Sequence, residues 1–272
     1  MKQETKWYSK VFLVLVMIFF YAPIIYVVIF SFNASKSLTN FTGFSLQWYE
    51  KMFKDRTIME SVYVTFLVAI LATLISTVVG TVTAIGLSKS NKVMRETITQ
   101  INNLPMMNPD IVTAIGFLLL FASFKIQTGF MTLLLSHIVF CIPYVILSIN
   151  PKLRQLDENI TEAALDLGCT PFQALTKVII PQIQPGIVAG ALIAFTMSID
   201  DFVISLFTTG PGVNTISIYV YSSFKRVNPT INALSSLMVI LITVVLIVVN
   251  VVPMIKERRG KKNEKVLQSV SK

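Results

Sequence analysis

Two adjacent carboxylates, Asp200 and Asp201, stand inside a long apolar run and are the side chains of this sequence best placed to do chemistry. A charged side chain at the centre of a bilayer costs about 2.5–3.5 kcal/mol on insertion scales, so such a pair needs a use or a partner. Carboxylates there can attract a passing cation or hold a divalent metal ion. A metal-dependent enzyme would usually need a third carboxylate four residues on, where this chain has Ser205. The pair favours a cation pathway, and a membrane enzyme stays open as the weaker alternative.

Asp110 is a third acid next to an apolar run, and it directly follows Pro109. A carboxylate in the first turn of a helix is stabilised by the helix dipole, so we interpret Asp110 as the capped start of a span. The preceding residues 98–107 are also fairly apolar, which leaves open a break inside the membrane at Pro109. In either case Asp110 joins Asp200 and Asp201 as a candidate for the substrate pathway.

His137 and Cys141 lie four residues apart and therefore share a helix face, but two residues do not make a metal site. We expect His137 to bond to a neighbouring helix. The chain also lacks a Gly-x-x-x-x-Gly-Lys-Ser/Thr loop, so it does not bind ATP in that way. We predict no catalytic residue, no metal and no cofactor, and any ATPase must be another subunit.

The composition is that of a membrane protein. Of 272 residues, 54% are hydrophobic and only 14% are charged, against about 25% in typical soluble domains. The net charge of +9 does not indicate nucleic acid, because the basic residues are spread over loops and tails instead of forming a patch with interleaved aromatic residues. We expect a multi-pass protein of the cell membrane with no nucleic-acid partner.

Apolar runs of about the length that spans a bilayer, roughly 20 residues, divide the chain. We predict an all-α integral membrane protein of one domain, 1–272, with six transmembrane helices at about 11–32, 61–87, 109–124, 130–149, 186–208 and 234–252. The second span carries a stripe of small residues, Ala72, Ser76, Gly80 and Ala84. Such stripes let helix backbones approach closely in lipid, so this face predicts a tightly packed bundle or subunit interface.

The basic residues also predict the orientation. With both termini inside, 16 of the 23 Lys and Arg residues fall on the inner side and 7 on the outer side. Positive residues are retained on the cytoplasmic side of membranes. The bias predicts an N-in/C-in protein whose loop 150–185 is cytoplasmic, which is the side where an ATPase would be.

The loop 150–185 is polar and helix-prone, and we interpret it as two short helices with a turn between them. Asp157 can cap the first helix, and Gly168 can end it because glycine adopts the left-handed conformation cheaply. The apolar face of this helix would consist of Ile160, Ala163, Ala164 and Leu167. The second helix has a threonine cap at Thr170, a proline at its first position and Gln173 placed for a capping box. We expect Pro181 and Pro185 to end it.

The spacing within this loop resembles the signature loop of ABC importer permeases. The pattern is Glu162-Ala163-Ala164, three residues, Gly168, nine residues, and then Val178-Ile179-Ile180-Pro181. Val178 and Ile180 stand where that family usually has Ile and Leu. The resemblance implies a type I ABC importer permease fold and a coupling segment that docks in a cleft of the cytoplasmic ATPase. Its coupling residues would be Glu162, Ala163, Ala164, Gly168 and Pro181.

Three further segments look like the spermidine/putrescine permeases, most of all the C-type subunit: residues 106–112, 136–143 and 195–201. That resemblance implies a heterodimer with a second homologous permease, two ABC ATPase subunits and an extracytoplasmic polyamine-binding protein. The residues agree independently with a cationic substrate. The six predicted spans contain no Lys or Arg, whereas one of them contains the acid pair Asp200 and Asp201.

Three alternatives remain open beside a polyamine permease. An ABC importer permease could carry another cation or amine, an ion-driven transporter could place acids in a span without the signature loop, and the membrane enzyme described above is the third.

Overall fold

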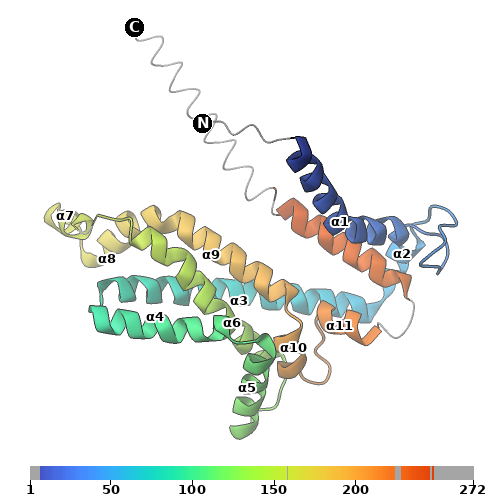
Figure 1. Cartoon of the computed structure of the whole chain (residues 1–272). Coiled ribbons are helices and arrows are strands. Elements are labelled where there is room, and N and C mark those ends of the chain that lie inside the picture. The colour runs from blue at the N-terminus through green and yellow to red at the C-terminus, as the bar shows by residue number, and fades with distance from the viewer. Residues whose placement is uncertain (1–6, 158, 224–227, 246, 248–272) are drawn as a thin grey trace. The chain divides into compact units, whose positions relative to one another are not determined.

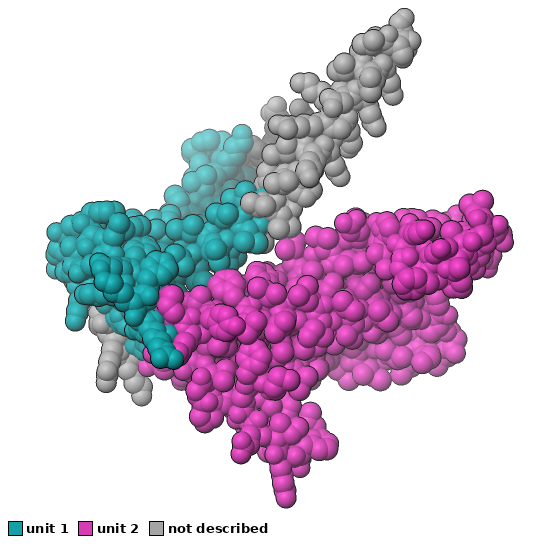
Figure 2. Space-filling model, turned by 180° about the vertical axis from the view of Figure 1, so that it is seen from behind, with its two compact units in different colours: residues 1–56, 223–272 teal, residues 57–222 magenta. Residues whose placement is uncertain are grey.

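The computed structural model describes residues 7–157, 159–223, 228–245 and 247. Within these ranges the secondary structure is helical apart from one isolated bridge between Asn33 and Phe44. The all-α class is therefore confirmed. The chain divides into two compact units, residues 1–56 with 223–272 (unit 1) and residues 57–222 (unit 2), which are coloured separately in Figure 2.

Unit 1 contains α1 (Trp7–Ser31), α2 (Gln47–Lys54) and the apolar helix Pro229–Val245. Asn33 orders the connection between α1 and α2 from a fully buried position. Its amide nitrogen donates to the carbonyl oxygens of Ser37 and Asn40, both at 2.9 Å, and its own carbonyl accepts from the indole of Trp48 at 2.6 Å. The helix α1 itself is apolar, yet none of its most apolar 18-residue window is buried.

Unit 2 carries the remaining helices. They are α3 (Arg56–Lys89, whose first residue belongs to unit 1), α4 (Lys92–Met107), α5 (Asp110–Ser123), α6 (Phe130–Leu153), α7 (Ile160–Asp166), α8 (Pro171–Ala174), the π-helix η1 (Leu175–Ile179), α9 (Ile180–Asp200), α10 (Val203–Thr208) and α11 (Ile216–Ser223, whose last residue belongs to unit 1). Figure 1 shows α6 crossing between α9 on one side and α3 and α4 on the other, with α7 and α8 at one end of the unit.

The core of unit 2 is built around α6. Buried residues of α6, among them Val145 and Ile149, pack with Ala84 of α3, Ala194 of α9 and Ile204 of α10. Glycines bring the backbones together: a Cβ on Gly190 of α9 would lie 3.1 Å from the Cα of Val145. Close backbone approach of this kind drives helix association in lipid, where apolar side chains give little preference for protein over lipid.

The small-residue stripe of α3 takes part in the same packing. Ala72, Ser76, Gly80 and Ala84 are all buried, and a Cβ on Gly80 would lie 2.7 Å from a methyl group of Val145. The prediction of a tight helix interface along this stripe is confirmed, and the neighbour is α6 of the same chain.

The described residues contain four helical stretches long and apolar enough to cross a membrane, Trp7–Ser31, Arg56–Lys89, Phe130–Leu153 and Pro171–Asp200. The pair α4 and α5 makes a fifth if it is taken as one span, although it is bent by 105°. The sixth predicted run, 234–252, corresponds to the shorter helix Pro229–Val245, and most of its remaining residues lie outside the described ranges. The count of six spans therefore stays a prediction.

Two expectations about helix ends are wrong. The sequence predicts a short basic loop at Lys89, Lys92 and Arg95, but α4 begins at Lys92, where Asn91 accepts the amide hydrogen of Met94 at 2.9 Å as an N-cap. The prolines at 181 and 185 do not end a helix either, since both lie within α9.

Candidate functional site

The end of α7 is fixed by Gly168. This residue has φ +84°, in the left-handed region, and its amide donates to the carbonyl of Leu165 at 2.9 Å. The next amide, that of Cys169, donates to Ala164 at 3.1 Å. The two bonds form a Schellman motif, in which glycine is favoured because it lacks a Cβ. The predicted role of Gly168 as the stop of the first helix is confirmed.

The start of α7 differs from the expected cap. The carboxylate of Asp157 accepts the amide hydrogen of Asn159 at 2.9 Å, and Asn159 occupies the N-cap position without a side-chain bond to the helix. Asp157 thus forms a turn before the helix, and the prediction that it caps the first helical turn is wrong.

The second helix starts as predicted. The hydroxyl of Thr170 accepts from the amide of Gln173 at 3.3 Å, and the Gln173 side chain accepts from the amide of Thr170 at 3.0 Å. Pro171 occupies the first helical position, where the missing N–H is not needed. This capping box rebuilds a helix only three residues after Gly168, so the direction of the chain is set by local bonds.

A π-helical turn carries the chain from α8 into α9. In η1 the amide of Ile180 donates to the carbonyl of Leu175, five residues back. The wider turn changes the register just before Pro181, which then stands at the start of α9 where its lack of an N–H is tolerated. Because the local turn absorbs the proline, the helix continues to Asp200.

The segment from α7 to α8 exposes large apolar side chains. Leu167 is 87% exposed and Phe172 is 73% exposed, while Ala164 is buried. The predicted apolar face of the first helix is therefore only partly correct, because Ala163 and Leu167 face outward. Glu162 is exposed in the first turn of α7. Exposed apolar groups beside an acid are typical of a surface that contacts another protein.

The chain leaves the helix at Asp201. Asp200 is the last residue of α9, and Asp201 has an extended backbone with φ −64° and ψ 129°. The carboxylate of Asp201 accepts the amide hydrogens of Ile204 at 3.2 Å and Ser205 at 2.7 Å, which satisfies donors at the start of α10. The expectation of one continuous helix over 186–208 is wrong, because a buried acid terminates it and begins a second one.

His137 of α6 holds this break from the other side. The His137 imidazole is 1% exposed, with Nδ1 at 2.7 Å from the hydroxyl of Ser198 and Nε2 at 3.1 Å from that of Ser205. Nε2 also lies 3.5 Å from Oδ2 of Asp201, an ion-pair distance when the ring is protonated. The prediction that His137 bonds to a neighbouring helix is confirmed, since Ser198 lies on α9.

A second bond fixes the far end of α10. The hydroxyl of Thr132, at the start of α6, donates to the carbonyl of Thr208 at 2.7 Å. Together with the His137 contacts it ties α10 to α6 at both ends. The cluster of His137, Ser198, Asp201 and Ser205 is called the break cluster below.

The other two acids are placed differently. Asp200 and Asp110 are both exposed, and the described residues give neither side chain a hydrogen bond or an ion pair. Asp110 begins α5, which packs against α10. The three candidate acids therefore do not converge on one site: one is buried in the break cluster, and two face outward from neighbouring elements.

The sequence signal for the break cluster was weak. The sequence predicts that His137 bonds to a neighbouring helix, but it does not identify Asp201, 64 positions away, as a partner. Ser198 and Ser205 had no signal at all, since single serines are common in apolar helices. No group of three or more His, Cys, Asp and Glu side chains within the described ranges could hold a metal ion.

The helical architecture and the signature spacing define a class of protein, and the family comparison agrees. Residues 76–259 match the family described as binding-protein-dependent transport system inner membrane component, and the chain belongs to that family. It is thus a permease component of a transport system and a multi-pass protein of the cell membrane.

Individual relatives are similar over most of the chain. The putrescine transport system permease protein PotI of Escherichia coli (strain K12) is 37% identical over 235 residues, which cover 84% of each chain. The spermidine/putrescine transport system permease protein PotC of the same strain is 35% identical over 237 residues, covering 87% of this chain and 90% of the relative. PotC of Haemophilus influenzae is 36% identical over 231 residues.

Solved structures show the same fold at low identity. A bacterial ABC transporter involved in the import of the acidic polysaccharide alginate matches with a TM-score of 0.70 at 18% identity, over 90% of this chain and 94% of that one. The alginate transporter in complex with an alginate pentasaccharide-bound periplasmic protein matches with a TM-score of 0.66 at 14% identity, over 89% and 90%.

Proposed function

We propose that this chain is the pore-forming permease subunit of an ATP-driven importer of polyamines such as putrescine and spermidine. The observation that supports this choice of substrate is the 35–37% identity to permeases of putrescine and spermidine/putrescine systems. The residues support it, because no Lys or Arg occurs in the predicted spans while exposed carboxylates stand at the ends of α9 and α5. Carboxylates favour cations over anions in a low-dielectric passage.

The proposed assembly has a second homologous permease subunit, two cytoplasmic ABC ATPase subunits and an extracytoplasmic polyamine-binding protein. A binding-protein partner is supported by the family, whose members are binding-protein-dependent, and by the fold neighbour solved with a periplasmic protein. The exposed surface of α7 and α8, with Leu167, Phe172 and Glu162, would dock on the ATPase. Ala163, Ala164, Gly168 and Pro181 would give the docking segment its shape.

The three acids have separate roles in this proposal. Asp201 braces the break between α9 and α10 through the break cluster, because its carboxylate is already occupied by two amides. Asp200 lines the pathway, because it is exposed and has no partner among the described residues. Asp110 contributes to the same pathway from the first turn of α5.

Reconstitution tests the function. The chain is combined with its candidate partner permease, ATPase and binding protein in vesicles, and ATP hydrolysis is measured with putrescine, spermidine and other amines. We expect polyamines to stimulate hydrolysis and uptake far more than amino acids or sugars. Uptake that persists without ATP would contradict an ABC mechanism. Stimulation by a different amine alone would contradict the polyamine assignment and identify that amine as the substrate.

The proposed topology of residues 1–272, one domain of six spans with both ends cytoplasmic, has its own test. Single cysteines in a background without Cys141 and Cys169 are introduced by Asn40→Cys, Asn228→Cys and Asn263→Cys. An impermeant thiol reagent applied to intact cells should label the first two and leave the third unlabelled. Labelling at position 263 would contradict the proposed orientation, because it would place the C-terminal end outside.

A further inference from the structure

A pocket of about 450 Å³ opens in unit 2 at the end of the bundle that carries α7. Its walls come from the last turn of α3, the first half of α4, the end of α6, the start of α7 and Ile179 of η1. The apolar part of the lining includes Leu87 and Ile179, each 6% exposed, together with Leu153, Leu156 and Ile160. The pocket therefore has a floor of aliphatic side chains.

The rest of the lining is basic. Three cationic side chains, Lys89, Arg95 and Arg154, border the pocket, against one acid, Asp157, among its described lining residues. Asp157 is already used, since its carboxylate accepts the amide hydrogen of Asn159 at 2.9 Å. Lys89 donates to the hydroxyl of Thr161 at 3.3 Å.

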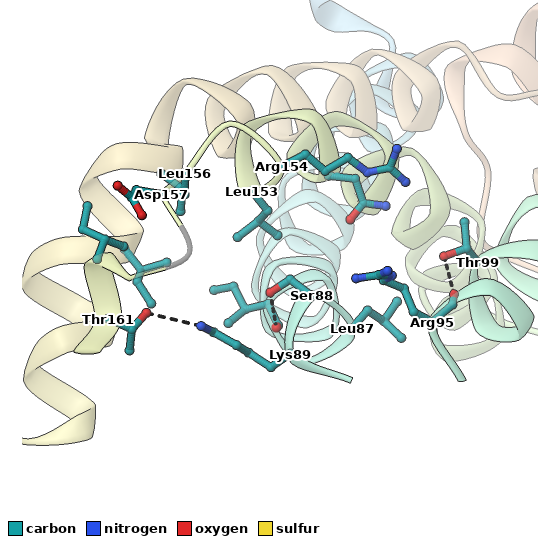
Figure 3. A pocket seen from close by; sticks show the side chains of 14 residues that line it. Leu87, Ser88, Lys89, Arg95, Thr99, Leu153, Arg154, Leu156, Asp157 and Thr161 are labelled. Carbon is teal, nitrogen blue, oxygen red and sulfur yellow. Dashed lines mark hydrogen bonds between the residues drawn. The ribbon is translucent and has the colours of Figure 1, made fainter. Parts of the chain in front are cut away.

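Among the described residues, Arg95 and Arg154 are the cationic groups of the lining without a partner. Neither guanidinium has a hydrogen bond or ion pair with the described residues. Figure 3 shows both on the side of the pocket away from Thr161; Arg95 comes from α4, and Arg154 directly follows the end of α6. Two guanidinium groups without a partner among the described residues thus lie beside a floor of aliphatic side chains.

We propose that this pocket binds a phosphate-bearing anion. A guanidinium presents a planar fork of donors that matches phosphate oxygens, and two of them together suit a doubly charged phosphate better than one carboxylate. Basic pockets between membrane helices with apolar floors bind phospholipid headgroups, so an anionic lipid is one source and a soluble phosphate ester is the other. A polyamine is excluded by its charge, so this site is distinct from the substrate pathway.

The position of the pocket gives the anion a structural role. Arg95 lies on α4, Arg154 follows α6, and Lys89 reaches Thr161 of α7. A bound phosphate would neutralise the two guanidinium groups and join α4 to the end of α6, which leads into the segment proposed to dock on the ATPase. The anion therefore stabilises the folded chain, and more so as its concentration rises.

The test measures the midpoint of thermal unfolding of the full-length chain, purified in mild detergent. The lipid arm compares added phosphatidylglycerol with phosphatidylcholine and with oleate, an anionic amphiphile without phosphate. The soluble arm compares glycerol 3-phosphate with chloride at equal ionic strength. We expect phosphatidylglycerol, glycerol 3-phosphate or both to raise the midpoint. The rise should be roughly 3 °C for each tenfold increase in ligand concentration above the dissociation constant.

Variants assign the effect to the pocket. Arg95→Gln with Arg154→Gln should lose most of the shift, whereas Lys177→Gln, which removes an exposed charge of η1 outside the pocket, should keep it. The charge-retaining pair Arg95→Lys with Arg154→Lys should keep part of it, which guards against a fold defect. A shift in the lipid arm alone identifies a lipid headgroup, and a shift in the soluble arm identifies a free phosphate ester. No shift in either arm, an equal shift with oleate, or a full shift in the double Gln variant would overturn the proposal.

Discussion

Two of the helix interruptions in unit 2 differ in what holds them. Between α7 and α8 the interruption is closed by bonds between residues no more than five apart, and its large side chains are exposed. Between α9 and α10 the interruption is buried, and His137 reaches it across 61 positions to Ser198 and 68 positions to Ser205. The first interruption presents a surface, and the second holds one helix against another.

This difference leads to opposite expectations for mutations. A change between α7 and α8 should leave the bundle folded, because little packing depends on the exposed side chains there. A change in the break cluster should reduce the folded subunit, because a buried polar group that loses its partner is destabilising.

Gly168→Pro is expected to have the largest effect on function. Proline fixes φ near −65°, far from the +84° observed, and it removes the N–H that donates to Leu165. The Schellman motif cannot form, so α8 leaves the proposed docking surface. We expect transport to be abolished while the subunit remains in the membrane, as measured by uptake and by immunoblots of membrane fractions.

A matched pair of milder variants controls for strain. Gly168→Ala and Gly212→Ala both place alanine in the left-handed region, at φ +84° and +83°, and each should cost about 1–2 kcal/mol. Only the first lies between α7 and α8, so only the first should lower polyamine-stimulated ATP hydrolysis. Equal losses in both would mean that strain, not docking, explains the effect.

Local chemistry explains why the first interruption could be predicted from the sequence. Gly168, Thr170 and Gln173 act on backbone groups within five residues, so their types and order contain the information. The same reasoning failed at Pro181, because the π-helical turn before it depends on how η1 packs through Ile179. Helix ends that rest on packing are not encoded in neighbouring residue types.

Glu162→Lys is expected to be the next largest change. Glu162 is exposed in the first turn of α7, where a negative charge is favoured by the helix dipole, so the folding penalty of lysine is only about 0.3–1 kcal/mol. The reversed charge on the proposed docking surface should nevertheless abolish transport and ATPase stimulation. Normal uptake in this variant would remove Glu162 from the docking surface.

Glu96→Lys is the matched control. It reverses an exposed acid of α4, which lies 4.0 Å from Lys92 in an exposed pair. Exposed pairs of this kind contribute about 0–1 kcal/mol, so neither stability nor transport should change much. The comparison separates a local docking contact from a general effect of net charge.

Asp201→Ala should act on assembly instead of coupling. The substitution leaves the amides of Ile204 and Ser205 without their acceptor and removes the carboxylate beside His137. Loss of hydrogen bonds to a charged group destabilises by about 1.5–3 kcal/mol, so the yield of folded, monodisperse subunit should fall several-fold. Asp201→Asn should recover part of the yield, because an amide oxygen still caps a helix.

A double-mutant cycle with His137→Gln sharpens this result. If Asp201 and His137 brace one structure, their combined loss is smaller than the sum of the single losses, with a coupling of about 0.5–3 kcal/mol. Additive effects would mean that His137 acts only through Ser198 and Ser205. The sequence could not have predicted this pair, because nothing in residues 130–149 indicates which later residue faces position 137.

Asp200→Asn is expected to have the smallest effect on the fold, and its effect on transport tests the pathway directly. Asp200 lies beside Asp201 in the sequence, but it is exposed and unbonded among the described residues, so asparagine should leave folding and assembly unchanged. If its charge attracts a polyamine during passage, neutralisation should lower the rate at limiting polyamine by about tenfold, equivalent to about 1.4 kcal/mol. Asp200→Glu should restore most of the rate, because it returns the charge.

Asp110→Asn is measured in parallel, with a smaller decrease expected since Asp110 lies in the first turn of α5, where the helix dipole partly offsets its charge. Uptake and ATPase stimulation are both recorded, because a pathway defect lowers uptake per ATP hydrolysed whereas a docking defect lowers both together. Wild-type uptake in Asp200→Asn and Asp110→Asn combined would end the cation-pathway argument. It would leave the comparison between the two interruptions intact, since that comparison rests on Asp201 and Gly168 alone.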